Sequence, residues 1–307
     1  MRLKAHRIWF PGSERKRKAV QGYWCEFLVT SFVKRRHMRR NFLNVCAVST
    51  FLLALAALAQ VGDPRGRRMR GINRSPVTRS SDEEGIPEPS RPNKEFTFAR
   101  LVYSGGTYAN NWTTDSPKAD IIFAAGIKRL TNLDVRETPF FMPLDSKLLH
   151  AYPFLYAVEV GYMHLSNEEA AILREYLLRG GFFVVDDFHG TVEWSNFEEQ
   201  IHKVFPDREV VEIPVTHPIF HCFFDINELI QIPGAQMLYT GRTYEKDGVF
   251  PHFRGIFDDK GRIMVMVNFN SDLGDSWEWA DVPYYPEKYA SAGLRLGINY
   301  VIYSMTH

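Results

Sequence analysis

The chain has 307 residues, of which 45% are hydrophobic and 14% aromatic, so it can bury a large core. This composition excludes a disordered chain, a collagen-like repeat and a disulfide-stabilised miniprotein. Its 37 Lys and Arg nearly balance 36 Asp and Glu, but residues 1–59 hold 12 basic and 2 acidic side chains, residues 60–94 hold 8 and 5, and residues 95–307 hold 17 and 29. Because the last segment is so acidic, it disfavours nucleic acids as partners and favours cations, neutral sugars or basic protein surfaces.

Residues 38–59 have the pattern of a secretory signal peptide. After Met38 come two arginines, an apolar stretch from Val45 to Ala59, and small residues before Gln60. We therefore expect Met38 to be the true start, residues 1–37 to be an upstream extension, and the protein to be exported to the periplasm or another part of the cell envelope. Cleavage would leave no stable membrane span. The alternative is an uncleaved anchor, although the stretch is shorter than the ~20 residues that a span needs.

Residues 60–94 are rich in Arg, Pro, Ser, Gly and Glu, which predicts a disordered linker. Residues 95–307 follow as a single domain. Cys25 and Cys46 lie in the part expected to be removed, so Cys222 is left without a partner for an intramolecular disulfide.

The domain alternates between short apolar runs and segments of helical period. The clearest helix is residues 166–179, where Ser166 and Glu169 form a capping box and Gly180 and Gly181 end the helix. In chain order the first half predicts a strand at 96–103, a helix at 119–130, a strand at 152–160, this helix, a strand at 182–185 and a helix at 194–205.

The second half predicts strands at 209–213, 236–244, 252–257 and 262–268, and a closing helix at 294–305. The turn at 258–261 joins two of these strands into a β-hairpin. Together these elements indicate an α/β fold with an open, mostly parallel sheet and helices on both faces. Ligands bind outside the carboxyl ends of such strands, which here directs attention to the loops 104–112, 161–164 and 186–190.

The segment LSNEEAAILREYLLRGGFFVVDDFHG, residues 165–190, resembles the class I glutamine-amidotransferase-like, flavodoxin-like superfamily. More narrowly, the motifs FTFARLVYSGG (96–106), YPFLYAVEVG (152–161), HPIFHCFFD (217–225), GRTYE (241–245), FRGIFDDKGRIMVMVNFNSDLGDSWEW (253–279) and GINYVIYSMTH (297–307) resemble the bacterial domain-of-unknown-function family 4159. The resemblance covers residues 95–307. It implies the fold and an envelope setting, and no established activity.

The chain departs from the glutamine amidotransferases at the position of their nucleophile. Those enzymes carry a reactive Cys on the turn after the strand that follows the Gly-Gly helix. Here that turn carries Asp186 and Asp187, whereas Cys222 lies elsewhere, next to Phe223 and Phe224. The resemblance therefore implies a domain without amidotransferase activity.

Asp186, Asp187 and His189 are the candidate catalytic residues, because they end a buried strand and supply oxygen and nitrogen ligands for a divalent metal or a general base. The alternative is that one Asp caps the following helix. His217 and His221 are further metal candidates, since their i, i+4 spacing would place both on one face of a helix, but two histidines that hold a loop by hydrogen bonds are the favoured interpretation.

Candidate ligand-binding residues are Gly105, Gly106, Trp112 and His164 in predicted loops, which offer backbone amides, an aromatic ring and an imidazole, and Arg242 on a predicted strand, which could bind a ligand carboxylate. The acidic run 270–278 has oxygens that suit calcium but lacks the EF-hand spacing, and a solvated turn is the simpler interpretation.

Two hypotheses follow. The first is an exported domain that binds a small ligand or an envelope protein at the carboxyl edge of its sheet without turnover. The second is a metal-assisted hydrolase that acts on a cell-envelope substrate through Asp186, Asp187 and His189.

Overall fold

A computed structural model describes residue 90, residues 92–105 and residues 111–307. The predicted extension, the signal peptide, most of the linker and Gly106 lie outside the described residues. Within the described part of the chain, no helix is both long enough and apolar enough to cross a membrane.

Seven strands of the described residues form one sheet in the order β2-β1-β3-β4-β7-β6-β5. Neighbouring strands from β2 to β7 are parallel, while β6 is antiparallel to β7 and β5 is antiparallel to β6. The open, mostly parallel sheet and the hairpin near the C-terminus are therefore confirmed. The strands are β1 (Ala99–Val102), β2 (Phe140–Pro143), β3 (Phe154–Ala157), β4 (Phe182–Val185), β5 (Val211–Glu212), β6 (His252–Phe257) and β7 (Ile263–Phe269).

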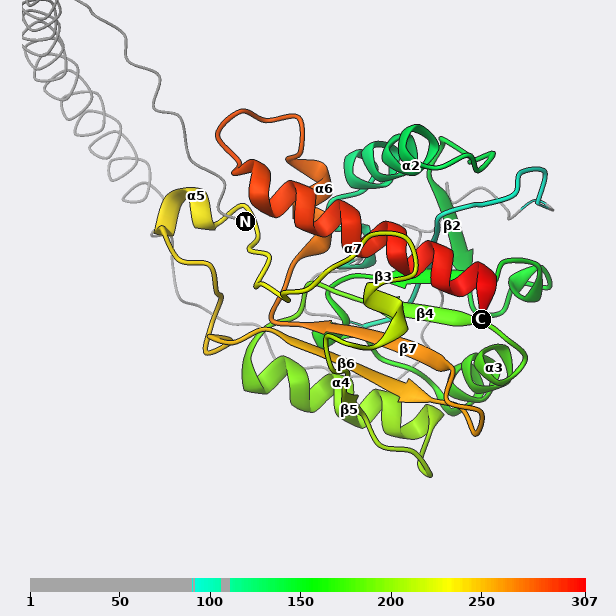
Figure 1. Ribbon diagram of the computed structural model, residues 1–307. Helices are drawn as coiled ribbons and strands as arrows, with labels where there is room; N and C mark the ends of the chain where they lie inside the picture. The colour runs from blue at the N-terminus through cyan, green and yellow to red at the C-terminus, as the bar shows by residue number, and fades with distance from the viewer. Residues whose placement is uncertain (1–89, 91, 106–110) are drawn as a thin grey trace, which may run out of the picture. The chain divides into compact units, whose positions relative to one another are not determined.

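Helices cover both faces of this sheet (Figure 1). Helices α3 (Asn167–Leu178) and α4 (Gly190–Val204) pack on one face. Helices α2 (Lys118–Leu130), α6 (Leu273–Glu278) and α7 (Glu287–Thr306) pack on the other, and α7 closes the chain as expected. One further short helix, α5 (Met237–Thr240), lies in the long connection between β5 and β6.

Strand β4 shows why the apolar runs predicted buried strands. Phe183 and Val185 belong to the core beneath α3 and α4, whereas Phe182 and Val184 belong to the core beneath α2, α6 and α7. Because successive side chains of a strand point to opposite faces, a strand covered on both faces must be apolar at every position.

The capping box of α3 is confirmed, since the Ser166 hydroxyl accepts from the Glu169 N–H at 3.1 Å and the Glu169 carboxylate accepts from the Ser166 N–H at 2.8 Å. The strand predicted at 236–244 is wrong. Residues 237–240 of this segment form α5, which is capped by Gly241 with a left-handed φ of 70°. Tyr239 on this helix is 83% exposed. Apolar spacing alone cannot distinguish a strand from an exposed helical turn of this length.

Candidate functional site

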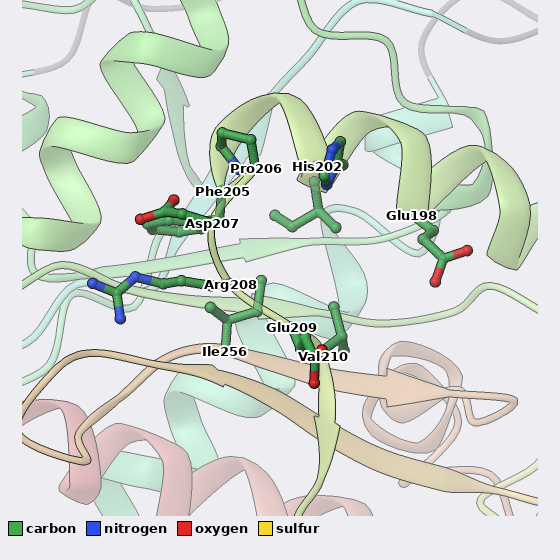
Figure 2. Close-up of a pocket in the computed structure, with 10 residues that line it drawn as sticks. Glu198, His202, Phe205, Pro206, Asp207, Arg208, Glu209, Val210 and Ile256 are labelled. Atoms are coloured by element: carbon green, nitrogen blue, oxygen red, sulfur yellow. The ribbon is translucent and has the colours of Figure 1, made fainter.

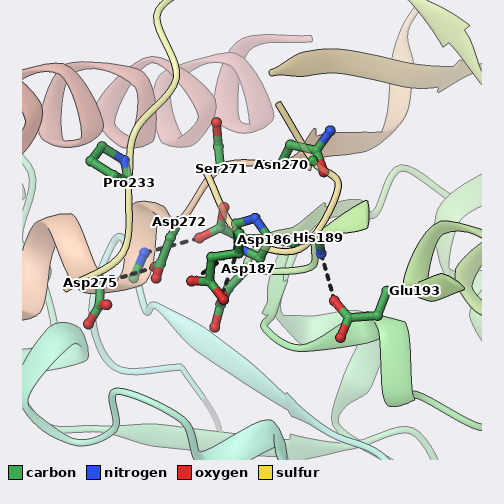
Figure 3. Close-up of polar contacts among 12 residues, drawn as sticks. Asp186, Asp187, His189, Glu193, Pro233, Asn270, Ser271, Asp272 and Asp275 are labelled. Atoms are coloured by element: carbon green, nitrogen blue, oxygen red, sulfur yellow. Dashed lines mark hydrogen bonds and ion pairs between the residues drawn. The ribbon is translucent and has the colours of Figure 1, made fainter. Parts of the chain in front are cut away.

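The carboxyl ends of β3, β4 and β7 bring three loops into contact. The Asp186 N–H donates to the Ala157 carbonyl at 3.0 Å, and the Asp187 N–H donates to the Ser271 carbonyl at 3.1 Å. These bonds tie the loop after β4 to its neighbours on both sides. Figure 3 shows the result, with the side chains of Asp186, Asp187 and His189 beside those of Asn270 and Asp272.

Asp186 is fully buried, and its Oδ2 atom is held by three donors. The Tyr156 hydroxyl donates at 2.8 Å, and the N–H groups of Leu273 and Gly274, at the start of α6, donate at 2.8 and 3.0 Å. The other oxygen, Oδ1, is buried without a hydrogen-bond partner. Asp186 thus fixes α6 against the end of β4. The alternative that an aspartate caps the following helix is wrong, because neither Asp186 nor Asp187 caps α4 and the helix that Asp186 holds is α6.

Asp187, His189 and Glu245 form a group whose ligand atoms all lie within 4.8 Å of one another. Asp187 Oδ1 is 3.2 Å from His189 Nε2, and Glu245 Oε1 is 4.0 Å from the same nitrogen. His189 is only 3% exposed, and its Nδ1 atom has no hydrogen-bond partner. The side chain of Glu245 is 28% exposed, so solvent reaches the group from that side.

Glu193, on the first turn of α4, holds this group in place. Its Oε2 atom accepts from the His189 N–H at 2.6 Å, and its Oε1 atom pairs with Lys246, the residue after Glu245. One buried carboxylate therefore fixes the segments that carry His189 and Glu245. Gly161 allows this, because a side chain there would collide with Glu193.

A second group consists of Asp115, Asp187 and Asp272, whose ligand atoms also lie within 4.8 Å of one another. Asp272 caps α6, with its Oδ1 atom accepting from the Asp275 N–H at 2.7 Å. Asp115 also belongs to a third group with Asp275 and Glu278. The carboxylates thus form a continuous series along the edge of the sheet.

Burial and mutual repulsion raise the pKa values of these carboxyl groups. Burial, followed by the negative charges of Glu159 and Asp186, holds the pKa of Asp187 well above its usual range. Burial, followed by the negative charge of Asp187, also raises the pKa values of Asp115 and Asp272 well above their usual range. Burial also raises the pKa of Asp186 to about 7, despite the three donors on its carboxylate. The site therefore carries an uncompensated excess of carboxylates.

Burial lowers the pKa of His189, which favours the neutral imidazole. That is the form in which histidine binds a metal.

Backbone strain is concentrated at this edge. Among the described residues, five that are not glycine have a positive φ, and they are Asp115, Glu159, Asp187, Lys246 and Asn270. Asp115 and Asp187 belong to the carboxylate groups, and Lys246 directly follows Glu245. The Glu159 N–H donates to the Asp187 carbonyl, and Asn270 Oδ1 accepts from Gly190, which follows His189. Non-glycine residues adopt this conformation only where the surrounding structure imposes it, and such residues often lie at functional sites.

The structure does not bring His217 and His221 to this edge. His217 Nδ1 accepts from the Ile219 N–H at 3.2 Å, while the His221 ring contacts the Val215 carbonyl at 2.8 Å and Asp225 at 3.2 Å. Among the described residues, no group with metal-ligand spacing includes either histidine. Their hydrogen bonds match the alternative that they hold a loop.

The predicted ligand-binding residues do not form one group in the structure. Trp112 is buried and its ring packs edge-on against Phe141, so it belongs to the core. Gly105 packs against the backbone of residues 162–164, where the left-handed φ of 122° requires glycine. His164 is exposed beside it, and Arg242 is exposed after α5, with its guanidinium 5.8 Å from the Tyr244 ring.

The acidic run 270–278 is not the solvated turn that was expected. Asn270, Ser271 and Asp272 are buried, and the run continues into α6. Asp115 and Glu245 were not predicted as site residues, because each comes from a segment distant in sequence from Asp187. The hint available in the sequence was the position of the acidic run 270–278 directly after a strongly apolar strand.

A pocket at the other end of the sheet offers no comparable group of side chains (Figure 2). It lies where α4 ends, near His202, Phe205 and Ile256. Its arginine, Arg208, is already bonded to the Phe257 carbonyl at 2.9 Å and to Asp259 at 2.8 Å. The carboxyl edge is therefore the better candidate for function.

Residues 97–305 match the family described as Domain of unknown function (DUF4159), so the chain belongs to that family. A comparison with curated proteins finds no match.

Proposed function

We propose that this member of the family binds a divalent cation at the carboxyl edge of its sheet through Asp187, His189 and Glu245. The observation that carries the proposal is the close approach of these three ligand atoms, all within 4.8 Å, with His189 Nε2 lying 3.2 Å from Asp187 Oδ1 and 4.0 Å from Glu245 Oε1. Carboxylate and imidazole groups suit Zn²⁺, Mn²⁺ or Fe²⁺.

The surrounding charges support a cation. Lys246 is already paired with Glu193, and Arg100 is bound to Asp120 at 3.1 Å through its Nε atom. Neither neutralises Asp187, so a metal ion would relieve the repulsion between Asp187 and its acidic neighbours.

We further propose that the cation supports hydrolysis, with the domain acting as a metal-assisted hydrolase. Three protein ligands leave coordination positions for water and substrate, as in catalytic rather than structural metal sites. The partial exposure of Glu245 gives such a substrate a route to the ion.

Ligand binding without turnover is the second candidate. It is favoured by the absence of a nucleophilic residue at the position where the amidotransferases carry Cys, since Asp186 and Asp187 occupy that turn. Chromogenic ester, amide and phosphate substrates, assayed with and without EDTA, distinguish the two. Turnover that EDTA abolishes supports the hydrolase, and binding of a ligand without any turnover supports the alternative.

The order β2-β1-β3-β4-β7 supports placing the fold with the flavodoxin-like, class I glutamine-amidotransferase-like proteins, because it reproduces the strand order 2-1-3-4-5. We also propose that the protein is exported to the cell envelope, on the basis of the signal-peptide pattern at 38–59. An envelope polymer or protein would then be its substrate or partner.

The substitution His189→Ala tests the cation site. In the full-length chain freed of metal with EDTA, Zn²⁺ or Mn²⁺ at about 100 times its Kd should raise the stability of the wild type by about 2.7 kcal/mol. His189→Ala should lose most of the gain that Zn²⁺ gives, measured by thermal unfolding with and without Zn²⁺.

His202→Ala is the matched control, because His202 is an exposed histidine near the opposite end of α4. It should respond to metal as the wild type does. Wild-type protein that gains no stability from any of these cations would contradict the proposal.

A further inference from the structure

The proposed cation site adjoins a second set of carboxylates and shares Asp187 with it. Asp115, Asp187 and Asp272 come from three separate loops, after β1, β4 and β7, yet one oxygen of each lies within 4.8 Å of the others. Figure 3 shows Asp187 and Asp272 on the side of the site away from Glu193.

Buried oxygen atoms without partners lie in and beside this set. Asp115 Oδ2 is buried and accepts no hydrogen bond. Asp186 Oδ1 is likewise unpartnered, on a side chain that is fully buried. The two carboxylates lie close together, because Asp115 Oδ2 is packed against Gly274, whose N–H donates to Asp186 Oδ2 at 3.0 Å. A buried oxygen without a donor is costly unless another group, such as a cation, satisfies it.

Asp272 has an oxygen left for a ligand. Its Oδ1 atom caps α6, while its Oδ2 atom faces Gly234, where a Cβ would come within 2.6 Å of it. Gly234 therefore leaves room for the Asp272 carboxylate, because a side chain there would collide with it.

The nearest arginine does not fill this space. The Arg100 guanidinium is fully buried, bonds to Asp120, and donates to the carbonyls of Trp112 and Thr114 at 3.2 and 2.9 Å. Arg100 thereby holds the turn that carries Asp115, but its hydrogen bonds go to Asp120 and to these two carbonyls rather than to Asp115, Asp187 or Asp272.

The group of Asp115, Asp275 and Glu278 is less suitable, because both oxygens of Asp275 are occupied. Its Oδ1 atom accepts from Trp279 Nε1 at 2.9 Å, and its Oδ2 atom accepts from the Ala235 N–H. Asp187 and Asp272 are therefore the better partners for Asp115.

We propose that Asp115, Asp187 and Asp272 bind a second divalent cation, so that Asp187 is a ligand shared by two metal ions. This inference rests on the proposed function, since the first ion is the one held by Asp187, His189 and Glu245. Oxygen ligands alone favour a hard cation such as Mg²⁺, Mn²⁺ or Ca²⁺.

A pair of ions at this edge defines the class of substrate. Two cations bridged by a carboxylate bind an oxyanion and stabilise both the attacking and the leaving oxygen during hydrolysis. The substrate class is therefore a phosphate ester, or another ester that presents an anionic group to the pair.

Manganese is the probe for this proposal. Full-length protein is titrated with Mn²⁺, the bound ions are counted by isothermal titration calorimetry and by elemental analysis, and electron paramagnetic resonance detects coupling between neighbouring ions. We expect about two Mn²⁺ per chain with a spin-coupled signal. Asp115→Asn should bind about one uncoupled ion, and so should His189→Ala.

Asp272→Asn serves as the second variant for this site, because asparagine is as good a helix cap as aspartate and should keep α6 intact. Asp259→Asn is the control, since Asp259 is an exposed carboxylate in the β6–β7 turn, and it should bind as many ions as the wild type. Circular dichroism of each variant checks that it is folded.

The outcomes separate this inference from the proposed function. One ion in the wild type, lost in His189→Ala and retained in Asp115→Asn and Asp272→Asn, overturns the second site and leaves the first intact. One ion lost in Asp115→Asn and retained in His189→Ala overturns the first site and the pair. No bound ion in the wild type overturns both.

Discussion

At the scale of single residues, Asp187 combines backbone strain, burial and close contact with other carboxylates. It has a left-handed backbone with φ of 51°, is 7% exposed, and belongs to two of the three carboxylate groups. Its neighbour Asp186 points to different partners, Tyr156 and the start of α6. Because adjacent side chains at a strand end point in different directions, Asp186 supports the site while Asp187 faces the proposed cation.

Asp186 should make the stability of the metal-free domain depend on pH. Its pKa is raised to about 7 in the folded protein, against about 3.9 in an unfolded chain, so the folded state binds the proton more tightly. The resulting stabilisation is fully present below about pH 4 and is lost as the pH rises through about 7. Urea unfolding in EDTA should therefore give a smaller free energy of unfolding at about pH 7.5 than at about pH 5.

Asp186→Asn tests this assignment. The amide oxygen can still accept from Tyr156, Leu273 and Gly274, but the group no longer titrates. The variant should lose less stability between the two pH values than the wild type does. An unchanged pH dependence in the variant would assign the effect to the other buried carboxyl groups instead.

At the scale of elements, the site depends on how α2 is fixed to β1. Arg100 on β1 forms a buried ion pair with Asp120 on α2 and also holds the turn before α2 that contains Asp115. Both side chains are almost completely inaccessible to solvent. Breaking such a pair leaves an uncompensated charge in the core.

Asp120→Ala should therefore reduce the free energy of unfolding by about 3–5 kcal/mol, measured by urea denaturation of the full-length chain. Asp207→Ala removes an exposed ion pair with Arg174 and should cost no more than about 1 kcal/mol. Equal losses in the two variants would mean that Arg100 finds another partner when Asp120 is absent.

Several elements could be predicted from the sequence because local patterns specify them. The residues of β4 and β6 agree with the predicted strands at both ends, and the capping box located the start of α3. Strand β2 and helix α6 were not predicted. Helix α6 is short and begins in an acidic run whose composition is typical of a surface turn. That run is buried only because β4, β7 and α7 surround it, which the local sequence does not show.

At the scale of the whole molecule, charge separates the N-terminal region from the domain. Residues 1–59 carry an excess of basic residues, 12 against 2 acidic ones, whereas residues 95–307 carry 17 against 29. The proposed removal of the signal peptide would take away most of this basic excess and leave a strongly acidic domain. Such a domain attracts cations to its carboxylate-lined edge.

The proposed export makes a specific prediction about the mature N-terminus. Protein recovered from the periplasmic or envelope fraction of cells that express the full gene should begin at Gln60, as determined by mass spectrometry of the intact chain. A variant with Ala57→Arg and Ala59→Arg should accumulate uncleaved, because the small residues that precede the cleavage position are lost. A mature chain that retains residues 38–59 in the wild type would instead support the uncleaved anchor.

The sequence by itself determined the α/β fold class, the two-sided burial of the central strands, and the position of Asp187 and His189 directly after a buried strand, because hydrophobic periodicity and strand ends are local properties of the chain. Only the tertiary structure decided which residues surround them. It brought Asp115, Glu245 and Asp272 to Asp187 from segments far apart in sequence, and it placed His217 and His221 elsewhere. The physical reason is that parallel strands align their carboxyl ends regardless of their separation along the chain, so the composition of a site at that edge follows from strand order.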